Sequence, residues 1–69
     1  MSVEKSIDLT ATGPSIEDAV SEAIHRASLT IQGLTGFEIE KIEGTIEEGE
    51  PTYRVLVRVT FVIKEKVHE

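Results

Sequence analysis

Four side chains at helical spacing have the residue types used in hydrolytic chemistry: Asp18, Ser21, His25 and Ser28. Steps of three and four residues place them on roughly one face of a helix. A hydrolytic site needs a histidine held by an acid and directed at a serine, beside an oxyanion hole. Residues on one short helix supply no such hole, so we interpret them as a solvated polar face. We expect no catalytic residue, and we expect that the protein is not an enzyme.

A second group of reactive side chains is the acidic cluster Glu47, Glu48 and Glu50, which falls in a predicted turn at residues 47–51. Carboxylate oxygens are ligands for Ca²⁺ and Mg²⁺, particularly where symmetry gathers several copies of a chain. The cluster lacks the spaced ligands and fixed glycine of an EF-hand. A metal site and a solvated hairpin tip therefore both remain open, with the solvated tip favoured.

Two cations, Arg54 and Arg58, flank Leu56 on the outward-facing positions of the last predicted strand. They could meet an anionic ligand. They could also pair with acidic residues of a neighbouring strand, and pairs of this kind are common in sheets. We favour the second interpretation, with three candidate partners: Glu38, Glu40 and Glu43.

The elements that position these residues follow from the apolar pattern. Val3, Ile7 and Leu9 alternate with polar residues and predict a first strand over residues 3–10, broken by residues 11–15. Ser15 is a good N-cap, and Gly33 is a natural stop. Between them, steps of three and four residues predict a helix over residues 15–32 with one apolar face: Ile16, Val20, Ala23, Ile24, Ala27 and Ile31.

The second half of the chain predicts two strands. The first begins at Phe37, and the apolar positions change parity between Ile39 and Ile42, which predicts a bulge or bend near residues 40–41. The last strand alternates most clearly, and one set of its side chains should face the helix: Tyr53, Val55, Val57, Val59, Phe61 and Ile63. The order β-α-β-β predicts an α+β fold, in which a three-stranded antiparallel sheet wraps around one helix as a single domain over residues 1–69.

Size and composition limit the function. A chain of 69 residues without cysteine has marginal stability alone and no disulfides, which favours self-association. The formal net charge of −6 argues against nucleic acid and anionic membranes as partners. The sequence shows no signal peptide and no membrane span, so we expect a cytoplasmic protein.

Taken together, these segments resemble a dodecin over nearly the whole chain. The resemblance lies in the end of the first strand at residues 9–12, the alanine-rich helix, and two short segments, Gly36-Phe37-Glu38-Ile39 and Ile42-Glu43-Gly44, before the final strand. It implies a homododecamer with tetrahedral symmetry. Flavin-binding dodecins stack flavins at two-fold interfaces and are thought to store or sequester them, and some members also bind coenzyme A. The ligand positions transferred by this matching are Gly36, Phe37, Glu38, Glu43 and Arg54.

This chain departs from the family pattern at three of these positions. Gly36 stands where flavin-binding dodecins have the tryptophan that stacks on the isoalloxazine ring. Arg54 replaces a glutamine that hydrogen-bonds the flavin, and Glu43 replaces a common arginine. Loss of one stacked ring alone should cost about 1 kcal/mol or more. The resemblance therefore implies a flavin pocket (for FMN, riboflavin or FAD) that is absent or remodelled.

The sequence thus predicts a dodecin-like, non-catalytic homododecamer that binds or stores a small ligand of the flavin type, with the cofactor itself unknown. Two alternatives remain. The first is a dodecin-like shell that binds Ca²⁺ or Mg²⁺, for which Glu47, Glu48 and Glu50 are the candidate ligands. The second is a structural or interaction module without a small ligand, which uses an open sheet edge to recruit another protein.

Overall fold

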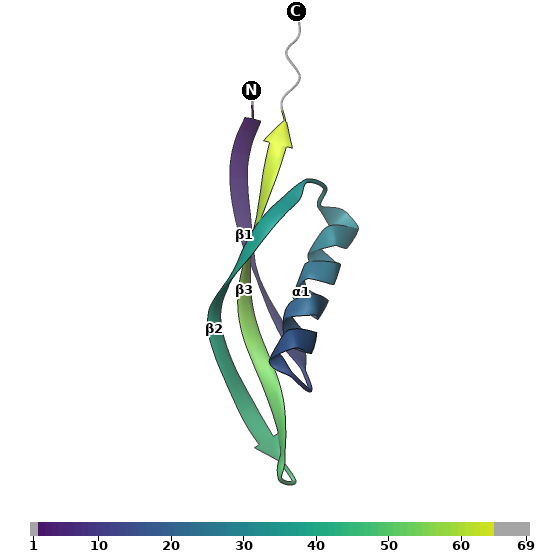
Figure 1. Cartoon of the computed structure of the whole chain (residues 1–69), viewed down its shortest axis with the longest axis vertical. Coiled ribbons are helices and arrows are strands. Elements are labelled where there is room, and N and C mark those ends of the chain that lie inside the picture. Colours follow the sequence, from purple (N-terminus) through teal and green to yellow (C-terminus); the bar gives the residue numbers. More distant parts are fainter. Residues whose placement is uncertain (1, 65–69) are drawn as a thin grey trace, which may run out of the picture.

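The computed structural model describes residues 2–64 of the chain, so the ends of the predicted domain at residues 1 and 65–69 lie outside it. The elements are β1 (Ser2–Gly13), α1 (Ile16–Thr30), β2 (Leu34–Glu47) and β3 (Glu50–Lys64). The three strands form one antiparallel sheet in the order β1-β3-β2. Figure 1 shows the long, curved sheet with α1 against one of its sides. The predicted α+β fold with β-α-β-β order is confirmed.

The helix begins as predicted. The Ser15 hydroxyl accepts a hydrogen bond of 3.0 Å from the backbone N–H of Asp18, which satisfies one of the free amides of the first turn. The predicted end at residue 32 is wrong, because α1 ends at Thr30 and its C-cap Ile31 is already extended. Ile31 therefore leaves the predicted helical face. Gly33, with φ of 82°, lies in the turn that follows.

The core is a contact between small and branched side chains. Ala19, Ala23 and Ala27 of α1 are at most 2% exposed, and they pack on Val55, Val57 and Val59 of β3, which are at most 1% exposed. Alanine lets the helix approach the sheet closely, while the valines fill the space between the two layers. The predicted inward face of β3 is confirmed at these three valines. Ile63 belongs to the same alternation but is 40% exposed.

All three strands are longer than predicted. β1 continues through the expected break to Gly13, which pairs with Tyr53. β2 starts at Leu34, before Phe37, and β3 starts at Glu50 because the hairpin turn contains only Glu48 and Gly49. Both turn residues have positive φ, 52° and 81°, as a two-residue hairpin of the type I′ kind requires.

The predicted irregularity in β2 is confirmed. The register with β3 shifts between Ile39 and Lys41, and a second shift lies between Leu34 and Gly36. Each extra residue bends the strand while keeping the apolar residues on the helix side. The first bulge was visible in the sequence as a change of parity. The second was not, because no alternating pattern precedes Phe37.

Candidate functional site

The side of the sheet that faces away from α1, here called the helix-free face, is mostly polar. Its positions follow from the register, because residues directly opposite each other in a ladder share a face. It contains one residue set from each strand: Glu4, Ser6, Asp8, Thr10 and Thr12 of β1, Arg54, Leu56, Arg58, Thr60 and Val62 of β3, and Gly36, Glu38, Lys41, Glu43 and Thr45 of β2. No helix covers these positions in the part of the chain that the structure describes (Figure 1).

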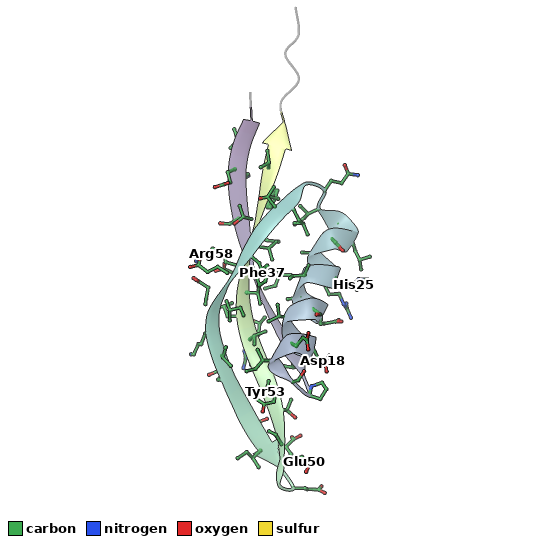
Figure 2. The ribbon with its side chains drawn as sticks, in the orientation of Figure 1. Asp18, His25, Phe37, Glu50, Tyr53 and Arg58 are labelled. Atoms are coloured by element: carbon green, nitrogen blue, oxygen red, sulfur yellow. The ribbon has the colours of Figure 1, made fainter. Side chains whose placement is uncertain are left out.

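Arg58 links all three strands on this face. Its Nε donates a hydrogen bond of 3.0 Å to Oδ1 of Asp8 on β1, and its Nη2 lies 3.1 Å from Oε1 of Glu40 on β2. The pKa of Arg58 is raised above its ordinary value, first by the hydrogen bond to Asp8, then by the charges of Asp8, Glu40 and Glu38. Figure 2 shows the Arg58 side chain on the side of the sheet away from α1.

The predicted pairing of the two arginines is therefore confirmed for Arg58 and Glu40 only. The partners predicted for Arg58 do not include Asp8. The alternation along β1 places Asp8 on the outward face, but the contact can be predicted only when the pairing of β1 with β3 is known. Among residues 2–64, Arg54 has no carboxylate within 4.0 Å. Glu43 stands opposite Arg54 in the ladder, but its carboxylate lies 3.6 Å from Nζ of Lys41 instead.

The ligand positions expected from the resemblance divide between the two faces. Gly36, Glu38, Glu43 and Arg54 lie on the helix-free face, where Gly36 pairs with Thr60 and Glu43 with Arg54. At a strand rise of about 3.3 Å per residue, the row of the sheet that contains Gly36 and Thr60 lies roughly 20 Å from the row that contains Glu43 and Arg54. Within one subunit, residues of these two rows are too far apart to contact the same planar ring.

Phe37 lies on the opposite side of the sheet, toward α1 (Figure 2). It pairs with Val59 and is 53% exposed. It starts an apolar stripe on β2 that includes Ile39, Ile42 and Ile46, with exposures of 39%, 49% and 78%. The stripe is bare because α1 packs mainly on β1 and β3 and touches β2 little. A row of exposed apolar side chains of this kind is typical of a protein–protein interface.

The remaining candidate residues are separate from this arrangement. Asp18, Ser21, His25 and Ser28 lie on exposed parts of α1, and Figure 2 shows His25 pointing away from the sheet. The Ser28 hydroxyl donates to the backbone carbonyl of His25 at 2.7 Å, not to a catalytic partner. This is the geometry of a solvated helix surface.

The acidic cluster lies at the hairpin tip between β2 and β3, where Glu47 pairs with Glu50 and Glu48 occupies the turn. No group of three or more potential ligands within residues 2–64 is arranged to hold a metal ion. A metal site at these three glutamates therefore stays a prediction, and it would need carboxylates from several subunits.

No helix within the described residues is long and apolar enough to cross a membrane.

The fold and its two exposed faces define a small α+β protein with a curved sheet around one helix and a bare apolar stripe. The dodecin family model matches residues 3–64, and the chain belongs to the dodecin family. A dodecin of Thermus thermophilus is 37% identical over 65 residues, which cover 91% of this chain and 94% of that protein. The resemblance seen in the sequence is thereby confirmed.

Solved structures agree with this assignment. A crystal structure of a Thermus thermophilus dodecin variant has a TM-score of 0.88 at 34% identity, covering 94% of this chain and all of that chain. A Streptomyces coelicolor dodecin has a TM-score of 0.86 at 28% identity, covering 94% and 96% of the two chains. A Mycobacterium tuberculosis protein described as a calcium dodecin with a novel calcium-binding site has a TM-score of 0.78 at 28% identity, covering 97% and 99%.

Proposed function

We propose that this protein is a non-catalytic homododecamer that binds and stores a small ligand. The observation that carries the proposal is the bare apolar stripe of Phe37, Ile39, Ile42 and Ile46 in a chain of the dodecin family. Exposing four large apolar side chains in a row is unfavourable for an isolated subunit, and burial against further copies removes them from water. A domain of 69 residues also gains stability that its own core is too small to supply.

The ligand site lies between subunits in this proposal. Two observations support this arrangement: Gly36 and Arg54 share the helix-free face, yet about 20 Å of strand separates them. A planar ring that contacts both kinds of position must therefore meet them on different copies. Flavin is the family's ligand type, and here it would lose the stacking platform at Gly36, so we propose a weakened or altered flavin site rather than the familiar one.

The test is native mass spectrometry of the purified protein without added ligand. A twelve-subunit mass is expected, and any excess mass can be ejected from the assembly and identified as flavin, another small molecule or metal. Native spectra that contain only monomers or dimers would overturn the storage proposal. They would favour the interaction module, whose open edge strands β1 and β2 can add a strand from a partner.

A calcium-binding shell is a second candidate. It is favoured by the acidic tip at Glu47, Glu48 and Glu50, by the net charge of −6, and by the similarity to a protein described as a calcium dodecin. A cation that binds only the folded assembly must raise its melting temperature. We expect a rise with millimolar Ca²⁺ that EDTA reverses and that Glu48→Gln reduces, with Glu17→Gln on the helix as the matched charge control. The absence of any shift would exclude this function.

A further inference from the structure

A shallow hollow of about 160 Å³ lies on the helix-free face, and all three strands contribute to it. Thr10 of β1 and Lys41 of β2 both pair with Leu56 of β3, so these three residues form one row across the sheet. Arg54 and Glu43 pair in the next row. Side chains in adjacent rows are near enough to contact a common ligand.

The hollow has an excess of positive charge in an acidic chain. It contains two cations, Lys41 and Arg54, and one carboxylate, Glu43. The carboxylate is associated with Lys41 at 3.6 Å. Within residues 2–64, no Asp or Glu oxygen comes within salt-bridge distance of the Arg54 guanidinium.

The other arginines show that this is unusual for the chain. Arg26 is neutralised by Glu22 at 2.8 Å. Arg58 has carboxylates from two strands within 3.1 Å. In a protein with formal net charge −6, acidic partners are abundant, so an arginine in a hollow without one is available to bind an anion from solution.

We propose that this hollow binds the anionic group, a phosphate or a carboxylate, of a small ligand. The Arg54 guanidinium offers a planar pair of donors that suits either oxyanion. Lys41 supplies a second charge, which an incoming anion draws away from Glu43, and the Thr10 hydroxyl can donate a further hydrogen bond. Leu56 provides an apolar surface for the part of the ligand next to the charge.

This inference rests on the proposed small-ligand function and names the chemical class of the ligand. A guanidinium presents charged N–H donors and no acceptor, so it selects a charged oxyanion over a neutral ligand. The position of Arg54 in the hollow, without a carboxylate at salt-bridge distance among residues 2–64, is the observation behind this choice of ligand class.

The experiment is isothermal titration calorimetry of the native assembly at low ionic strength, with inorganic phosphate and with acetate as separate probes. Saturable binding of at least one probe is expected, and Arg54→Gln should weaken it by about tenfold or more, because hydrogen bonds to charged groups are strong. Arg54→Lys should retain part of the affinity. Stronger binding of phosphate assigns the hollow to phosphate esters, and stronger binding of acetate assigns it to carboxylates.

The matched control is Arg26→Gln, which removes the same charge from the opposite side of the subunit and should leave the affinity unchanged. The proposal is overturned if neither probe binds saturably, or if the two glutamine variants lose affinity equally, since net charge alone would explain that result. Native mass spectra keep the two failures apart. Absence of the twelve-subunit species from the unsubstituted protein would contradict the proposed function, while the calorimetry still decides the anion site. Its loss in a variant alone would show that the substitution disrupts the assembly, and Arg54→Lys then supplies the affinity comparison.

Discussion

Arg58 of β3 and Asp8 of β1 lie 50 residues apart in the sequence and are joined by two hydrogen bonds, of 3.0 and 3.5 Å. The same guanidinium reaches Glu40 of β2. One side chain in the central strand thus holds both edge strands of the sheet. It also offsets the repulsion among carboxylates that the fold gathers on one face.

Replacing Arg58 with glutamine should lower the free energy of unfolding, because Asp8, Glu38 and Glu40 lose their common cation. The effect should shrink at high salt, which screens exposed charges. Urea denaturation at a fixed subunit concentration, in low and high salt, measures it. Arg26→Gln is the control, since it breaks only an exposed pair within α1. An equal loss in both variants would show that Arg58 has no special role.

The pH dependence of this contribution has a definite sign. The pKa of Arg58 is raised on folding, mainly by its hydrogen bond to Asp8. Stability from a raised pKa is complete below the unfolded value and is lost only as the pH rises through the folded value. Both values for an arginine lie far above neutrality. The stability difference between the native chain and Arg58→Gln should therefore stay constant from about pH 6 to about pH 9. A difference that declines with rising pH in this range would contradict the assignment.

The close helix–sheet contact should not tolerate a larger side chain. Ala23 is 1% exposed against the β3 valines, so Ala23→Leu should destabilise the protein by about 1–3 kcal/mol through overpacking. Ser21→Leu introduces the same side chain at an exposed position of α1 and should have little effect. Chemical denaturation of the two variants compares them directly. If Ala23→Leu is as stable as Ser21→Leu, the core is looser than the structure indicates.

The parts of the fold that the sequence predicted are those determined locally. Alternation identified the inward valines Val55, Val57 and Val59, and the change of parity between Ile39 and Ile42 located a bulge. Strand ends were underestimated because pairing with β3 imposes extended structure on residues of low strand propensity. Gly13 opposite Tyr53 is such a case.

The candidate site was harder to predict because its contacts depend on register. The alignment of distant strands determines that Arg58 contacts Asp8. It also places Glu43 opposite Arg54, although the Glu43 carboxylate lies near Lys41 instead. The sequence gives residue types and faces, but not which partner is closest when several acids are available. The bare stripe on β2 was also hidden, because it depends on which strands α1 covers.

Two glycines, Gly49 in the hairpin turn and Gly36 near the start of β2, differ in backbone conformation and can be compared. Gly49 has a φ of 81°, in the region that penalises other residues, so Gly49→Ala should destabilise the protein by about 1 kcal/mol. Gly36 has no such φ, and an added Cβ there would meet no atom within 4 Å. Gly36→Ala reduces the conformational entropy of the unfolded chain by the same amount but adds no strain to the folded state, so it should be neutral or slightly stabilising. Thermal unfolding of both variants tests this, and equal effects would contradict the left-handed turn.

The open space at Gly36 allows the flavin question to be tested by restoring a ring. Gly36→Trp should leave the subunit fold intact, because an added Cβ meets no atom within 4 Å and Gly36 lies on the helix-free face, where the ring can extend away from the core. Stacking worth about 1 kcal/mol per ring should raise riboflavin affinity about fivefold or more. Quenching of riboflavin fluorescence measures the affinity. Thr45→Trp is the control, since Thr45 lies on the same strand and face but at the hairpin end. If Gly36→Trp binds riboflavin no better than Thr45→Trp, restoring the indole alone does not create a flavin site, and Arg54 and Glu43 become the next positions to change.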